Sequence, residues 1–114
     1  MLRISESIKG DLAIVAISGV MINADAIALN EKVKNLVHRD FKKIILDLGE
    51  TKLMNSCFGL GIITACWAYV NRFEGKLTLA NPNAKVAQLL KMTKLDQVLE
   101  VADTLKQAEA AFHS

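Results

Sequence analysis

Apolar residues recur along the chain in two patterns, which predict strands and helices in alternation. Short extended apolar runs predict strands at residues 2–6, 12–18, 43–48, 76–80 and within 95–101. Apolar positions three or four residues apart predict helices over residues 24–38 and 57–71, and helices that begin after Asn83 and after Asp103. Asn23 stands where the N-cap of the first helix belongs. A Gly turn at residues 9–11 predicts that the first two strands form a hairpin.

This order of elements predicts an α/β fold with a mixed, mainly parallel sheet of four to five strands and about four helices. The length of 114 residues predicts a single domain over residues 1–114. Sites in such folds lie at the carboxyl ends of the parallel strands. In this chain that edge would carry residues 19–23, 49–57 and 81–83.

Composition and charge exclude several functional classes. The net charge is +2 and the basic residues are scattered, which argues against direct nucleic-acid binding. Cys57 and Cys66 have no histidine near them in sequence, so two reduced thiols in a cytoplasmic protein are expected rather than a metal site. Residues 53–70 carry no charge, but they include Asn55 and Ser56, which favours a buried helix over a membrane span.

Ser56 lies where the N-cap of the helix over residues 57–71 belongs, and a cap of this kind contributes about 1 kcal/mol. Asp47, at a strand end, could be a catalytic or phospho-accepting carboxylate, but no acidic pair stands ready to hold Mg²⁺ with it. Gly59-Leu60-Gly61 lacks the rest of a phosphate-binding loop. We therefore expect no cofactor, no metal and no enzymatic activity.

Four segments together resemble one family. The chain reads LDLG at 46–49, NSCFGLG at 55–61, GKLTLAN at 75–81 and LLKMTKLDQV at 89–98. This series is similar to the STAS domains of anti-sigma factor antagonists, in which a buried strand leads through a loop to Asp-Ser-Ser-Gly-Leu-Gly or Asn-Ser-Thr-Gly-Leu-Gly. The resemblance covers nearly the whole chain and implies a STAS-like fold.

The resemblance also implies a function in transcription regulation by partner switching. Ser56 would be phosphorylated by a serine kinase of the GHKL type that is itself the anti-sigma factor. The unphosphorylated module would bind this partner, and a PP2C-type phosphatase would restore it. The implied partner-binding residues are Met21, Ile22, Asn23, Asn55, Ser56, Cys57, Phe58 and Gly59. Whether the domain also forms a weak homodimer is left open.

Three departures from the family pattern keep an alternative open. Phe58 is an extra residue before the glycines, so a shifted register would place Cys57 at the acceptor position. The acidic residues that the family carries after its early strand are replaced by the apolar stretch 19–23. Gly49 replaces a common serine, a change expected to matter little. The alternative is a STAS scaffold subunit of a transporter or signalling complex that is not phosphorylated.

Overall fold

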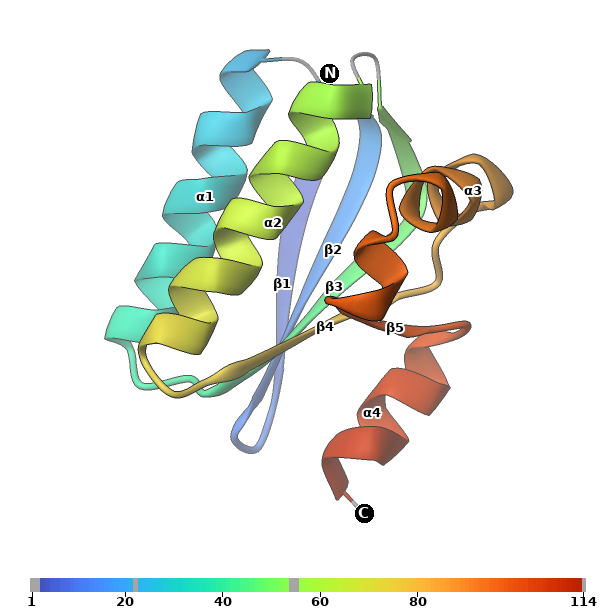
Figure 1. Ribbon diagram of the computed structural model, residues 1–114. Helices are drawn as coiled ribbons and strands as arrows, with labels where there is room; N and C mark the ends of the chain where they lie inside the picture. The colour runs from blue at the N-terminus through green and yellow to red at the C-terminus, as the bar shows by residue number, and fades with distance from the viewer. Residues whose placement is uncertain (1–2, 22, 54–55, 114) are drawn as a thin grey trace.

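The computed structural model describes residues 3–21, 23–53 and 56–113, and their side chains except at residues 21, 23–26, 50–53, 56–59 and 113. Its five strands lie in the sheet in chain order: β1 (Arg3–Lys9), β2 (Leu12–Met21), β3 (Lys43–Leu53), β4 (Lys76–Ala80) and β5 (Glu100–Ala102). The described helices are α1 (Asn23–His38), α2 (Ser56–Arg72), α3 (Ala84–Met92), the 3-10 turn η1 (Leu95–Gln97) and α4 (Leu105–His113). β1 is antiparallel to β2 and the other pairs are parallel, so the predicted mixed α/β sheet is confirmed (Figure 1).

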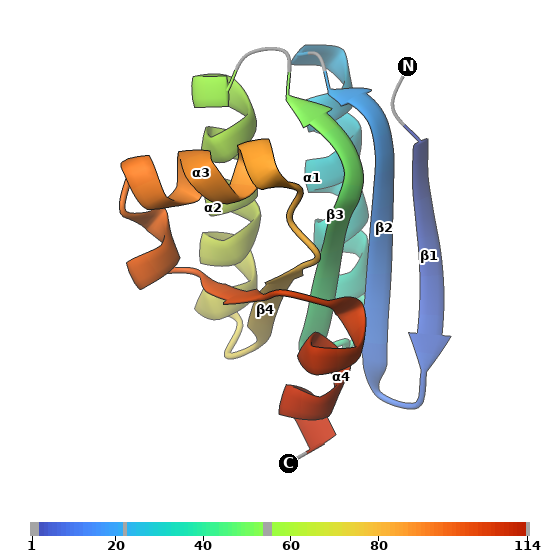
Figure 2. The same cartoon turned by 90° about the vertical axis from the view of Figure 1, so that its right-hand side faces the viewer.

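Two apolar clusters hold helices to the two faces of the sheet (Figures 1 and 2). The larger cluster joins one sheet face to α1, α2 and α3, with Leu36, Ile63 and Leu90 among its buried members. The smaller cluster lies on the opposite face, where Ala108 of α4 packs against Ile45 and its neighbours. The two faces of each central strand are therefore both buried near its middle, which explains the nearly continuous apolar run at 43–48.

β2 and β3 are longer than the apolar pattern predicts. β2 continues through Gly19, with φ of 96°, to Met21. The apolar pattern predicts that the third strand ends at residue 48, but β3 continues to Leu53. The two extensions pair with each other in parallel, residues 18–21 with residues 50–53. The register of β2 against β3 shifts between Ala16 and Ser18, just before this pairing begins. Backbone pairing between the two extensions accounts for these additional residues.

Asn23 and Ser56, which the sequence predicts as N-caps, are instead the first residues of α1 and α2. The start of α3 agrees with the sequence, and the cap of α4 differs. Asn83 caps α3 as predicted, because its side-chain oxygen accepts a hydrogen bond of 3.0 Å from the Val86 N–H. Asp103 was expected to cap α4, but the Thr104 hydroxyl takes this role and accepts a 3.1 Å bond from the Gln107 N–H. Thr104 directly precedes the first residue of α4, which is the position that an N-cap occupies.

Candidate functional site

Most of the partner surface expected from the sequence meets at one end of the sheet. β2 and β3 end side by side, with Met21 paired to Leu53. α1 begins at Asn23 and α2 begins at Ser56, so both helices start next to these strand ends (Figure 1). Ile22 and Asn55 lie outside the described residues.

Ser56 is the first residue of α2, and Cys57, Phe58 and Gly59 continue its first turn. This turn contains no acidic residue. The free amide groups and the dipole of a helix favour an anion at its N-terminus. α2 is 17 residues long, so its first turn exerts this stabilising effect in full. The local field at Ser56 is therefore suited to a negative group added there.

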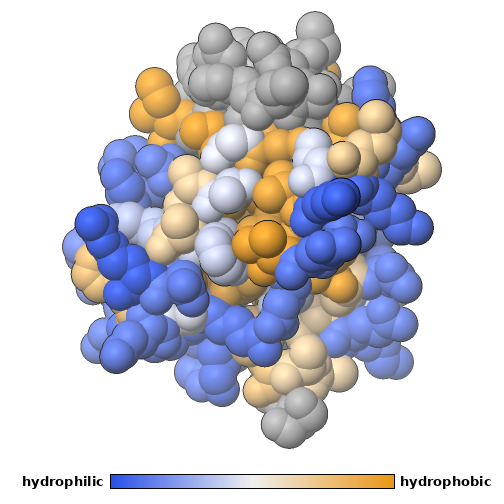
Figure 3. All heavy atoms as spheres, in the orientation of Figure 1, coloured by the Kyte–Doolittle hydropathy of each residue, from blue (hydrophilic) through white to orange (hydrophobic). Residues whose placement is uncertain are grey.

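The described side chains next to this end include exposed apolar and small residues. Ile27, in the second turn of α1, is 67% exposed. Gly61, Ala65 and Ala68 form the exposed side of α2, so this helix is less deeply packed than its apolar sequence suggests. Figure 3 shows apolar and weakly polar side chains over the α2 region, with charged side chains on either side. Small exposed side chains let another surface approach the helix backbone closely.

Two titratable side chains on or beside α2 have defined surroundings. Cys66 is fully buried, and this burial raises the pKa of its thiol to about 12, so the reactive thiolate is suppressed. The His38 ring nitrogen Nε2 lies 2.9 Å from the Tyr69 hydroxyl at the other end of the helices. In the described part of the chain, no three His, Cys, Asp or Glu side chains gather as a metal site. The same residues include no helix long and apolar enough to span a bilayer.

Asp47 is held by two neighbours. Its Oδ1 accepts hydrogen bonds from the Gly49 N–H at 3.1 Å and from Asn81 Nδ2 at 3.5 Å. A Cβ atom at Gly49 would overlap Asn81 Nδ2, so glycine is what allows this packing. A serine at this position would require the Asn81 amide, which bonds to Asp47, to move. The one available signal was that Asp47 and Asn81 fall at the ends of adjacent parallel strands.

Comparison with known proteins gives a family match and curated relatives. The model of the STAS domain matches residues 3–108. Proteins of Thermotoga maritima and Thermotoga neapolitana, provisionally named as an anti-sigma factor antagonist and a homologue of one, are each 31% identical over 72 residues. The aligned region is 63% of this chain and spans 63% of the length of these relatives.

Solved structures show the same fold. A Thermotoga maritima crystal structure, also provisionally named as an anti-sigma factor antagonist, has a TM-score of 0.83 and 22% identity, over 97% of this chain and 95% of its own. The unphosphorylated anti-sigma factor antagonist SpoIIAA has a TM-score of 0.80 and 15% identity, over 97% and 96% of the two chains. SpoIIAA of Bacillus in its phosphorylated form has a TM-score of 0.74 and 14% identity, over 96% and 99%.

Proposed function

Because the chain belongs to the STAS domain family, we propose that it is an anti-sigma factor antagonist switched by phosphorylation of Ser56. In this proposal the unphosphorylated module binds a GHKL-type serine kinase that acts as the anti-sigma factor. Phosphorylation of Ser56 releases the partner, and a PP2C-type phosphatase restores binding. The module acts in the cytoplasm as a binding protein and not as an enzyme. The family match, together with relatives and solved structures that carry the antagonist name, supports this proposal.

The position of Ser56 at the first residue of α2 is the observation that carries the proposal. A phosphate at this position adds close to two negative charges. The N-terminus of α2 stabilises that charge, so the fold tolerates the modification. A partner that packs against a serine hydroxyl would instead have to bury an unpaired charge. A cost of about 3–4 kcal/mol would weaken binding several hundred-fold.

The proposed interface extends from Ser56 over the neighbouring strand end and helices. Met21 and Asn23 belong to it because β2 ends, and α1 begins, next to the end of β3. The exposed Ile27 and the small side chains along α2 would continue the contact onto the two helices. Apolar residues at the centre of a contact are typical of protein interfaces.

Binding of Ser56 variants to the GHKL kinase from the native host tests the proposal. We expect Ser56→Asp to fold like the wild type and to lose binding by calorimetry, and Ser56→Ala to bind constitutively. The matched control is Ser7→Asp, which adds the same charge at an exposed position of β1. If Ser56→Asp and Ser56→Ala both bound like the wild type before and after incubation with kinase and ATP, the switch would be rejected.

A second candidate function follows from the two residues, Cys57 and Phe58, that separate Ser56 from Gly59-Leu60-Gly61. In this case the domain is a scaffold subunit of a transporter or signalling complex without phosphorylation. Mass spectrometry of the protein isolated from its native host separates the two functions. A phosphate on Ser56 supports the switch, whereas an unmodified protein recovered with a stable assembly supports the scaffold.

A further inference from the structure

The sheet face opposite α1 and α2 is only partly covered. α4 packs over Leu12, Ile14 and Ile45 through Leu105 and its neighbours. Figure 2 shows α4 in front of the lower end of β3, with the upper parts of β1, β2 and β3 free of any helix on this side. The side chains on that bare part determine what the face can hold.

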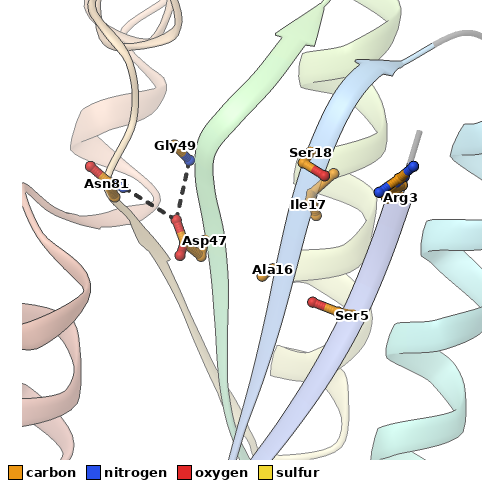
Figure 4. Close-up of a pocket in the computed structure, with 8 residues that line it drawn as sticks. All are labelled: Arg3, Ser5, Ala16, Ile17, Ser18, Asp47, Gly49 and Asn81. Atoms are coloured by element: carbon orange, nitrogen blue, oxygen red, sulfur yellow. Dashed lines mark hydrogen bonds between the residues drawn. The ribbon is translucent and has the colours of Figure 1, made fainter. Parts of the chain in front are cut away.

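One row of short side chains crosses all five strands on this face. The strand registers pair its members in sequence: Ser5, Ala16, Asp47, Ala80 and Ala102. Because none of them is large, the face is hollowed above α4. The resulting open cavity has a volume of about 320 Å³, and its lining includes Arg3, Ser5, Ala16, Ser18, Asp47 and Asn81 (Figure 4). This volume is at the lower end of the range for small-molecule sites, about 300–1,000 Å³.

The cavity has opposite charges on opposite sides. Arg3 lies on β1, paired with Ser18, whereas Asp47 lies on β3 with β2 between them. Among the side chains that the structure describes, Arg3 forms no ion pair and no hydrogen bond. The Asp47 carboxylate is oriented through Oδ1 by the Gly49 N–H and Asn81 Nδ2, while Oδ2 has no partner among the described residues. A guanidinium group and a carboxylate oxygen therefore remain available to an occupant.

We propose that this cavity binds a small zwitterion with a carboxylate at one end and a primary ammonium group at the other. The carboxylate would face Arg3, which can bind it through two parallel hydrogen bonds. The ammonium group would face Oδ2 of Asp47, and Ser5 and Ser18 contribute hydroxyl groups to the same lining. Two strand spacings of about 4.8 Å, together with an offset of two residues along the strands, place the backbones of Arg3 and Asp47 about 12 Å apart. A flexible Arg side chain shortens this span to the length of an ω-amino acid.

The test uses 4-aminobutyrate, with butyrate and butylamine as probes that each carry one of its two charges. Titration is followed by amide chemical shifts in ¹H–¹⁵N spectra, at millimolar concentrations. We expect 4-aminobutyrate to shift the amides of Ser5, Ala16, Ser18 and Asn81. We expect each single-charge probe to bind at least about tenfold more weakly than 4-aminobutyrate. Each probe lacks one of the two charged groups that would form a charge-assisted hydrogen bond. Absence of localised shifts with 4-aminobutyrate would overturn the proposal.

Matched variants separate the cavity from a general charge effect. Arg3→Gln should lower the affinity for 4-aminobutyrate about tenfold, to that of butylamine. Asp47→Asn should lower it to that of butyrate. The controls remove the same charges elsewhere: Arg72→Gln at the exposed end of α2, and Asp40→Asn in a turn with φ of 71° that asparagine also adopts. Equal binding by the cavity variants and the controls would refute the proposed site.

A variant that fills the hollow keeps the test independent of charge. Ala16→Leu places a larger side chain in the middle of the cavity and leaves both charged groups in place. Its spectrum reports directly whether the fold is retained. Loss of 4-aminobutyrate binding by this folded variant supports the cavity, and unchanged binding contradicts it. None of these variants changes Ser56, so the result is independent of the proposed phosphorylation switch.

Discussion

The same substitution, glycine to alanine, should change stability in opposite directions at Gly61 and Gly75. Gly61 lies inside α2, and a Cβ atom added there would have no heavy atom within 4 Å outside the local backbone. Alanine is favoured over glycine in a helix interior by about 1 kcal/mol. Gly61→Ala should therefore stabilise the protein by roughly that amount, with no steric cost to offset the gain.

At Gly75, in contrast, the Cβ atom would meet three neighbours that cannot easily move. It would lie 2.8 Å from Val70 Cγ1, 3.0 Å from the Lys42 carbonyl oxygen and 3.2 Å from the Val70 carbonyl oxygen. Val70 is fully buried, and its carbonyl already accepts the Gly75 N–H at 2.9 Å. The Lys42 carbonyl accepts the Lys76 N–H at 2.7 Å, where β4 begins. Overpacking of this kind costs about 1–3 kcal/mol.

Urea denaturation followed by circular dichroism measures both effects. The two variants should differ in free energy of unfolding by about 2–4 kcal/mol, the sum of the helix-propensity gain and the overpacking cost. In thermal unfolding each kcal/mol should shift the Tm by about 4 °C for a domain of this size. The steric reasoning would be refuted if Gly75→Ala were as stable as the wild type, or if Gly61→Ala were less stable. Because Gly61 lies on the exposed side of α2, its variant should also bind the proposed partner more weakly.

Two further predictions concern titratable groups. Hydrogen bonds from Arg39 at 3.2 Å and Lys32 at 3.1 Å hold the pKa of Glu6 below its ordinary value. The ionised Glu6 therefore stabilises the fold above about pH 4.5, and this stabilisation is lost as pH falls through the lowered pKa. Glu6→Gln should cost about 0.5–1 kcal/mol at pH 7 and much less at pH 3 in urea titrations, and an equal cost at both would contradict the ionic origin. Cys66 should resist an aromatic disulfide reagent in a folded Cys57→Ser background and react once urea unfolds the protein, because burial raises its pKa to about 12. Rapid reaction in the folded state would show that the thiol is accessible.

The local pattern of apolar residues was sufficient to predict the elements whose apolar side chains pack in the core. Residues 76–80 form β4 with the bounds that the sequence predicts, and α2 differs from its prediction by one residue at each end. Both segments place apolar residues against the main core, so their patterns directly reflect the packing. The resemblance to the STAS family followed from four segments, of which the motif at 55–61 is the most specific, and the family match confirms it. The role of Ser56 stays a prediction.

The extensions of β2 and β3 could not be read from local pattern. Residues 49–52 are glycine and polar residues, a composition typical of a loop. They form a strand because their backbone groups pair in parallel register with residues 18–21, which are distant in sequence. This non-local pairing also carries β3 up to the start of α2, which fixes where the helix N-terminus lies. The position of Ser56 in space therefore depends on an interaction that its own sequence motif does not contain.

The cavity on the second sheet face illustrates the same limit for a site. Its row of short side chains has one member on each strand, so no stretch of sequence contains two of them. The sequence analysis places Asp47 at the end of one predicted strand and Asn81 just after another, but it could not bring Arg3 to the same hollow. Only the registers of β1 and β3 against β2 do so. Arg3 and Asp47, which no sequence motif connects, thus line one candidate binding site because strand pairing brings them to the same face of the sheet.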